Sequence, residues 1–269
     1  MSLPKPIEDP FGLAPRMKLY EEASQLMLPR RLPLIIRVDG RAFSKLTSAD
    51  EKPWDPRVRM AMESAARWLL AEIQGAKFAY CQSDEISVLA TDYDALNSEP
   101  WFGKNLQKVV SIAAATATNG FNFVQAQTGN GLATFDARAF VLPHAEACNY
   151  FVWRQRDAVR NSIQGLAQAH FSHRQLQGLS GPQLQEKLWQ ERGVNWNGCE
   201  AWQKRGFCVR IHPSLRVTTT TYPSPETDPV VIVETPEFSK EREYVDRFVF
   251  LTEVKDDGPS RVLDVRLPE

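Results

Sequence analysis

The sequence lacks several features that would assign it to particular classes of protein. Its 4 cysteines form no C-x-x-C pair, and its 4 histidines show no ligand spacing to them, which argues against a zinc site. No apolar run approaches the ~20 residues of a transmembrane helix. The N-terminal residues include prolines and charges where a signal peptide needs an apolar segment. We therefore expect a soluble, cytoplasmic protein with reduced thiols and no membrane contact.

Neither sign of charge is in excess. The 269 residues include 32 Lys and Arg against 33 Asp and Glu, a formal net charge of −1. This balance excludes nucleic-acid binding driven by overall charge, although it leaves a local basic face open. Hydrophobic residues make up 43% and charged residues 24%, which is typical of globular proteins. A chain of this length buries about three quarters of its unfolded surface, so its core needs no metal or disulfide.

The order of the predicted elements indicates an α+β fold of the ferredoxin-like kind. Apolar and β-branched runs predict strands, and helical spacing predicts helices. The elements follow one another as strand 34–38, helix 56–73, strand 78–81, strand 86–90, helix 104–125 and strand 135–142. This order is the βαββαβ unit. Only four residues separate the two middle strands, which predicts a tight hairpin.

The rest of the chain has a different character. Helices are expected at about 146–171 and 180–191, then short strands at 207–211, 215–221 and 230–234 and a polar helix near 237–246. We divide the chain into an N-terminal segment (1–32), the βαββαβ unit (33–145), a helical extension continuous with it (146–212) and a C-terminal β-containing tail (213–269).

Three carboxylates are predicted to converge at one edge of the sheet. Asp39 ends the first strand, and Asp84 and Glu85 lie in the hairpin turn. A right-handed crossover makes the first two strands parallel and places the third between them, so this strand end lies beside the turn. Clustered carboxylates stay charged only beside positive charge, and oxygen ligands favour Mg²⁺. A pair of such ions would clamp the attacking and leaving oxygens of a phosphoryl transfer.

The loop after Asp39 fits a phosphate-binding role. Gly40 has no side chain, so its backbone can approach a metal ion and a triphosphate closely. Arg41 and Ser44 follow in the same loop and can donate hydrogen bonds to phosphates. The alternative is that residues 39–40 form an ordinary polar turn and residues 84–85 a solvated hairpin tip.

Five segments in a fixed order extend this picture. They are IRVDGRAF (36–43), YCQSDEIS (80–87), FDAR (135–138), YFVWRQRD (150–157) and GVNWN with KRG (193–206). Together they resemble the motifs of the tRNA(His) guanylyltransferase superfamily, in order and spacing, from about residue 30 to residue 210. The resemblance implies that the βαββαβ unit is a polymerase-like palm and the catalytic domain.

The resemblance also implies a reaction and its cofactors. The RNA 5′ end is activated by ATP or GTP, and the 3′-hydroxyl of an incoming nucleotide then attacks the activated phosphate, so growth is 3′-to-5′. Carried over by motif, Asp39 and Asp84 bind two Mg²⁺ ions, the Gly40 carbonyl joins one, and Glu85 completes the catalytic set. The family further implies a homo-oligomer, a tetramer.

Two larger sets of residues are expected to bind substrates. Those assigned to the nucleoside triphosphate are Asp39, Gly40, Arg41, Ala42, Phe43, Ser44, Ser83, Asp84 and Lys104. Those assigned to contact with the tRNA are Lys108, Arg154, Asp157, Asn161, Lys204 and Arg205. Lys104 and Lys108 are four residues apart, so they can share one helical face.

One departure from the family pattern bears on the substrate. The tRNA(His)-specific branch has H-I-N-N-L-Y-N after the fourth motif, and this chain has Val159 at the histidine position, although Asn161 matches. We therefore expect template-directed repair of 5′-truncated tRNA, with guanosine addition to tRNA(His) as the alternative. A palm-type nucleotidyl cyclase would need no RNA face. An RNA-recognition module would stack bases on aromatic residues of its third strand, but strand 86–90 has none.

Overall fold

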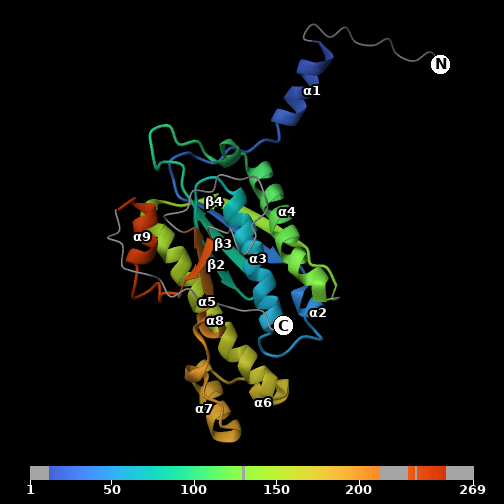
Figure 1. Ribbon diagram of the computed structural model, residues 1–269, viewed down its shortest axis with the longest axis vertical. Helices are drawn as coiled ribbons and strands as arrows, with labels where there is room; N and C mark the ends of the chain where they lie inside the picture. Colours follow the sequence, from blue (N-terminus) through green and yellow to red (C-terminus); the bar gives the residue numbers. More distant parts are fainter. Residues whose placement is uncertain (1–11, 129–130, 212–229, 234, 253–269) are drawn as a thin grey trace, which may run out of the picture.

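A six-stranded sheet lies at the centre of the molecule (Figure 1). The structure is a computed structural model and describes residues 12–128, 131–211, 230–233 and 235–252. The strands are β1 (Leu34–Gly40), β2 (Ala76–Gln82), β3 (Glu85–Ala90), β4 (Phe135–Val141), β5 (Phe207–Ile211) and β6 (Val230–Val233). Their order is β4-β1-β3-β2-β5-β6, and every neighbouring pair is antiparallel.

Helices cover both faces of the sheet. The longer ones are α1 (Leu13–Glu22), α3 (Pro56–Glu72), α4 (Leu106–Gln125), α5 (His144–His170), α7 (Gly181–Arg192) and α9 (Glu243–Val249). The short ones are α2 (Phe43–Leu46), η1 (Trp101–Lys104), η2 (Ala126–Thr128), α6 (His173–Leu176), η3 (Trp196–Gly198) and α8 (Ala201–Arg205). Among the residues that the structure describes, no helix is both long and apolar enough to cross a membrane.

The predicted βαββαβ order is confirmed as β1-α3-β2-β3-α4-β4. β3 lies between β1 and β2, so β1 and β2 run parallel as the crossover rule requires. The hairpin between β2 and β3 pairs Gln82 with Glu85, which leaves Ser83 and Asp84 at its tip. Ser83 has φ 50°, the left-handed backbone that a two-residue hairpin turn demands.

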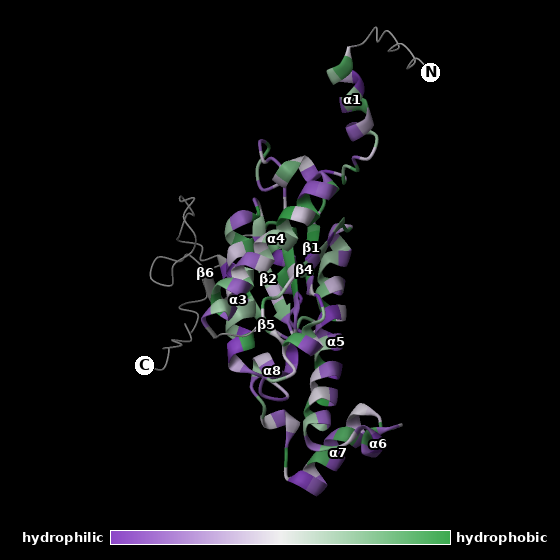
Figure 2. Ribbon diagram, turned by 90° about the vertical axis from the view of Figure 1, so that its right-hand side faces the viewer, coloured by the Kyte–Doolittle hydropathy of each residue, from purple (hydrophilic) through white to green (hydrophobic). Residues whose placement is uncertain are grey.

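Alternation along each strand sends side chains to two apolar layers. On β1, Ile36 and Val38 pack with α3 and α4, whereas Ile35 packs with α5 and α9. β3 is buried along its whole length because both of its faces are covered. Figure 2 shows the apolar colouring concentrated in this central region, with α1 standing apart; α1 buries none of its own residues.

The start of α3 is specified locally. Asp55 is the N-cap and Pro56 the first helical residue, as the sequence predicts. The Asp55 carboxylate accepts hydrogen bonds from the backbone N–H groups of Arg57 (2.8 Å) and Glu51 (3.2 Å). Asp55 therefore fixes both the helix and the loop that precedes it.

The strands beyond the βαββαβ unit join the same sheet. β5 pairs with the free edge of β2, and β6 pairs with β5. The predicted strand at 215–221 lies outside the described residues. The helix expected at 237–246 is found at Glu243–Val249 instead, because residues 237–241 form a turn on the Glu237 carbonyl that places Phe238 in the core.

Candidate active site

The structure brings Asp39 and Asp84 together at one edge of the sheet. Asp39 lies near the end of β1, directly opposite Glu85 on β3. The backbone N–H of Gly40 donates to the Asp84 carbonyl over 2.9 Å, which ties the end of β1 to the hairpin tip. Both aspartates line the same cavity. The convergence deduced from topology is therefore present in the fold.

The two aspartates lie in an environment that disfavours their negative charge. Burial raises the pKa of Asp39, and the nearby Glu85 and Asp136 raise it further. Burial also raises the pKa of Asp84, with Asp39 adding to the effect and a hydrogen bond from Ser83 opposing it. A cation between the two carboxylates would relieve both effects. Oxygen donors of this kind suit Mg²⁺, which commonly takes one or two carboxylates and completes its shell with water and phosphate. In the part of the chain that the structure describes, no group of three or more Asp, Glu, His or Cys side chains is arranged to hold a metal ion.

The loop after β1 is shaped by close packing at Gly40. A Cβ on Gly40 would lie 2.3 Å from the Phe43 ring, so no larger residue fits without displacing that ring. The Phe43 ring is buried against Phe121 and Phe135, with centroids 5.2 and 5.3 Å away. This anchor leaves Ser44 exposed at the cavity. The loop can therefore present its backbone and a hydroxyl to a phosphate group.

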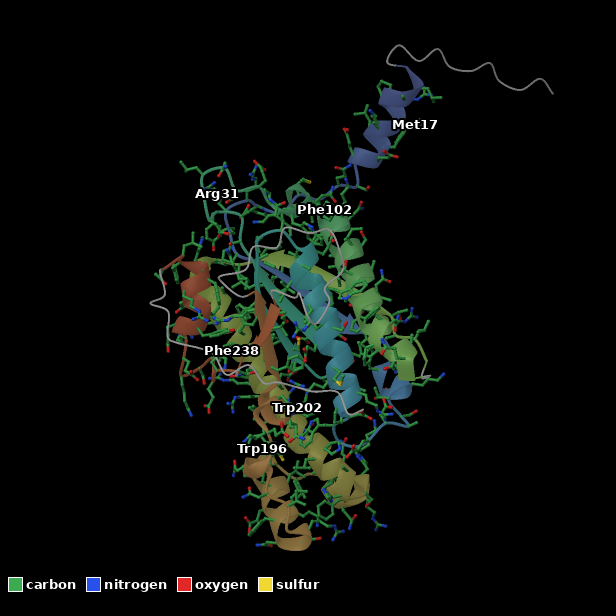
Figure 3. All side chains as sticks on the ribbon, in the orientation of Figure 1. Met17, Arg31, Phe102, Trp196, Trp202 and Phe238 are labelled. Atoms are coloured by element: carbon green, nitrogen blue, oxygen red, sulfur yellow. The ribbon has the colours of Figure 1, made fainter. Side chains whose placement is uncertain are left out.

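The cavity has a volume of about 710 Å³. Its wall extends from the hairpin and the β1 loop to α5 and α8, and it includes Trp202 of α8, which Figure 3 labels below the sheet. Among the residues that the structure describes, six carboxylates and four cationic side chains line it: Asp39, Asp50, Glu51, Asp55, Asp84 and Glu85, with Lys52, Arg59, Arg154 and Lys204. The cavity is thus acidic overall, and a polyanionic ligand needs additional cations to bind there.

Sequence reasoning missed one part of this wall. Lys52, Trp54, Arg59 and Trp202 all line the cavity. The first three follow the β1 loop in a Pro- and Trp-containing stretch just before and after the N-cap of α3, which was the available signal. The guanidinium of Arg59 lies over the Trp202 ring, 5.4 Å from its centroid, so this wall combines aromatic surface with positive charge.

Glu85 is placed differently from the two aspartates. Arg154 binds it with two hydrogen bonds, Nε to Oε1 (2.8 Å) and Nη2 to Oε2 (2.6 Å), and both side chains are buried. Arg154 was expected to contact RNA; it lines the cavity, and the structure places its guanidinium against Glu85. Asp157 bonds to the exposed Arg160 and lies 3.3 Å from Arg154, so it too is held by neighbours on α5.

Two residues expected to bind the nucleotide lie outside the cavity. Lys104 is buried, with its ammonium bonded to Asp92 and to the carbonyls of Pro29 and Leu32. It adjoins Phe102, which Figure 3 shows above the sheet, whereas Trp202 lies below it. The helical pattern concealed this because the chain turns at residues 102–104, all with positive φ. The Arg41 side chain is exposed and is not part of the cavity wall.

The remaining predicted RNA contacts divide into two groups. Asn161 and Lys204 line the cavity beside α5 and α8. Lys108 is exposed near the start of α4, outside the cavity, and Arg205 donates to the Thr235 carbonyl over 3.0 Å. Lys204 and Arg205 also border a smaller cavity of about 370 Å³ on the other side of α5. Of these four residues, the structure therefore places Asn161 and Lys204 at the aspartates' cavity, which Arg154 also lines.

A βαββαβ sheet with two aspartates at a strand end and an adjoining hairpin is the arrangement of the polymerase-like palm that the motif resemblance implies. Comparisons with known proteins agree with this class. A family model described as tRNAHis guanylyltransferase matches residues 14–143. The tRNA(His) guanylyltransferase of Debaryomyces hansenii is 31% identical over 216 residues, or 72% of this chain and 79% of that protein.

Solved structures give the same result. A bacterial tRNA(His) guanylyltransferase-like protein in complex with ATP is 44% identical, with a TM-score of 0.80 over 88% of this chain and 99% of that one. One in complex with GTP is 41% identical, with a TM-score of 0.73 over 88% and 98%. The chain belongs to the tRNA(His) guanylyltransferase family, and it is therefore an enzyme of the nucleotidyltransferase type. The resemblance carried by the five motifs is confirmed.

Proposed function

We propose that this protein is a magnesium-dependent nucleotidyltransferase that activates the 5′ end of a tRNA with ATP or GTP and adds a nucleotide to it. The observation that carries the proposal is the pairing of Asp39 with Asp84 in an acidic cavity large enough for a nucleotide. The bacterial relatives described above are complexes with ATP and GTP, which supports triphosphate binding in this cavity. We also propose that growth is 3′-to-5′, that the metal is Mg²⁺ and that the RNA substrate is a tRNA.

Different residues at the cavity can bind the metal, the triphosphate and the RNA. Asp39, Asp84 and the Gly40 carbonyl would hold Mg²⁺, which supplies positive charge to the attacking and leaving oxygens when bound. The exposed hydroxyl of Ser44 can donate to a phosphate oxygen, whereas that of Ser83 donates to Asp84. The Asn161 amide is exposed at the other end of the cavity and can donate to the RNA.

Guanosine addition to tRNA(His) is the better supported of the two specific activities. The curated relative reported above is named for it, whereas repair of truncated tRNA rests on Val159 at the family's histidine position. Val159 is half-buried and packs against the apolar cluster of α5, α6 and α7. Unlike the histidine of the family motif, valine has no titratable group to offer at this position. The valine at this position makes repair of 5′-truncated tRNA the second candidate activity.

The non-catalytic alternative is disfavoured by the sheet. An RNA-recognition module needs an open sheet face for base stacking. Here α3 and α4 cover one face and α5 the other, and β3 is buried on both sides. A homotetrameric assembly and a cytoplasmic location remain predictions from the sequence.

The test compares two RNA substrates with one enzyme preparation. Purified protein is incubated with Mg²⁺, ATP and labelled GTP, together with either full-length tRNA(His) lacking the extra guanosine or another tRNA shortened by its first nucleotide. Extension of tRNA(His) alone supports guanosine addition. Preferential extension of the shortened tRNA supports repair. No extension of either RNA, with Mg²⁺ present and the protein folded, contradicts the proposed function.

A further inference from the structure

A buried clamp connects α5 to the hairpin that bears Asp84. Glu85 and Arg154 are 6% and 7% exposed, and two hydrogen bonds of 2.8 and 2.6 Å join them. Gln82 and Ser87 each add a hydrogen bond of 3.3 Å to Glu85 Oε1. This bidentate geometry is the most specific that Arg and a carboxylate can form. Every oxygen of Glu85 is therefore already engaged within the protein.

The clamp separates Glu85 from the two aspartates in chemical role. A metal ion that recruited Glu85 would compete with Arg154 for the same carboxylate, at the expense of a buried ion pair. Breaking a buried ion pair in this way is strongly unfavourable. Asp39 and Asp84 have no comparable cation bonded to them among the described residues. This arrangement agrees with a side-chain ligand set of Asp39 and Asp84, with Glu85 outside it.

The clamp also counters a repulsion built into the sheet. Asp39 lies opposite Glu85 on β3 and opposite Asp136 on β4, so three acidic residues follow one another across three strands. Like charges at facing positions of a sheet destabilise it. Arg154 neutralises the member next to the hairpin tip, and Arg37 lies 3.9 Å from the same carboxylate.

We propose that Arg154 is a positioning residue, which holds Glu85 out of the metal shell and fixes the hairpin tip so that Asp84 faces Asp39. Glu85 directly follows Asp84, and the Gly40 N–H bond to the Asp84 carbonyl joins the tip to β1. Anchoring Glu85 to α5 therefore sets the position of Asp84 from a third element. The inference rests on the proposed function, because its consequence is the placement of the metal ligands.

The clamp reaches the surface of α5. Asp157 lies 3.3 Å from Arg154 and bonds to Arg160, which is exposed. The Trp153 ring is 54% exposed, and the guanidinium of Arg154 lies over it at 4.6 Å from the centroid. Trp153 covers Arg154 from the solvent side. The clamp is therefore supported on both sides, by Glu85 in the sheet and by Asp157 and Trp153 on the helix.

The experiment compares Arg154→Met, Arg154→Lys, Glu85→Gln and the double variant Glu85→Gln/Arg154→Met with wild type. Arg156→Met is the matched control, since Arg156 is an exposed arginine two residues along the same helix. Three quantities are measured: the single-turnover rate of nucleotide transfer, the Mg²⁺ concentration for half-maximal rate, and hydrogen exchange of the 80–87 hairpin. Magnesium-dependent ATP binding, followed by calorimetry, is measured in parallel as a readout independent of RNA.

We expect Arg154→Met to slow transfer by about 100-fold, the cost of a misplacement of about 1 Å at a reacting centre. The half-maximal Mg²⁺ concentration should rise, the hairpin should exchange faster, and the KM for tRNA should stay unchanged. The transfer rate of Arg154→Lys should lie between those of Arg154→Met and wild type, and the transfer rate of Arg156→Met should match wild type. Because the two residues act as one unit, the double variant should be no slower than Arg154→Met.

Three results would overturn the inference. An increase in the Mg²⁺ requirement for Glu85→Gln but not for Arg154→Met would make Glu85 a metal ligand. A raised KM for tRNA with an unchanged single-turnover rate in Arg154→Met would make Arg154 an RNA contact. If hairpin exchange and Mg²⁺-dependent ATP binding are both unchanged in Arg154→Met, Arg154 does not position the hairpin tip. If wild-type protein extends no tRNA, the proposed function fails, and hairpin exchange with ATP binding still decides the role of Arg154.

Discussion

Replacing Lys104 with methionine should destabilise the fold without weakening nucleotide binding. Lys104 and Asp92 are 1% and 2% exposed and 3.1 Å apart. The ammonium also donates to the carbonyls of Pro29 and Leu32, each over 3.0 Å. The Asp92 carboxylate accepts from the backbone N–H of Arg31 as well. The pair therefore joins the segment before β1 to the turn before α4.

The loss of unfolding free energy in Lys104→Met follows from the Asp92 carboxylate that is left without its cation. Methionine fills most of the volume but leaves a buried carboxylate uncompensated, which costs about 3–5 kcal/mol. With a slope of about 2–3 kcal/mol per molar urea, the unfolding midpoint should fall by about 1–2 M. Lys108→Met is the matched control on α4, where the side chain is exposed, and its midpoint should not move.

The assay is urea unfolding followed by circular dichroism, with ATP binding measured on the same samples under native conditions. Changing Asp92 to asparagine in the Lys104→Met background removes the uncompensated charge and should recover part of the lost stability. A Lys104→Met variant with wild-type stability and weakened ATP binding would refute the structural assignment. That outcome would restore Lys104 to the nucleotide-binding set expected from the sequence.

Three further predictions concern local structure. Asp55→Ala removes the N-cap of α3 and should lower the free energy of unfolding by about 2 kcal/mol, seen as a lower melting temperature; an unchanged one would contradict it. Hydrogen bonding to Arg57 lowers the pKa of Asp55 from 3.8 to about 2, so its contribution is complete above pH 3.8 and is lost as the pH falls towards 2. Wild type and Asp55→Ala should therefore converge in stability on acidification, and a constant difference would contradict this. Gly206 has φ 76° and a Cβ there would lie 2.3 Å from the Cys81 carbonyl, so Gly206→Ala should melt well below wild type, whereas Gly198→Ala, in open space, should not.

The sequence predicts the palm because each of its signals is local. Alternation and helical spacing mark β1, α3, β2, β3 and α4 within a few residues of their observed ends. The crossover rule then places Asp39 beside Asp84 without knowledge of any contact. The N-cap of α3 follows from Asp55 and Pro56 alone. The limits of these strands and helices depend on residues close together in the chain, so the sequence alone predicts them.

The parts that escape prediction depend on long-range partners. Lys104 has the spacing of a phosphate-binding residue, but Asp92 and two distant carbonyls engage it. Arg154 lies 69 residues from Glu85 in the chain, so its burial is visible only once α5 packs on the sheet. The turn at Glu237 delays α9 because Phe238 is drawn into the core beside Phe78 and Phe151.

Asp39 and Asp84 are proposed to support transfer of a nucleotide to the 5′ end of a tRNA. The most direct measurement is the single-turnover rate of labelled-nucleotide transfer by Asp39→Asn, compared with Asp136→Asn. Asp136 lies opposite Asp39 on β4 but does not line the cavity. We expect Asp39→Asn to fold with the wild-type circular dichroism spectrum and to transfer no measurable nucleotide at any Mg²⁺ concentration, while Asp136→Asn remains active. Wild-type transfer by Asp39→Asn would show that Asp39 is not needed for the reaction.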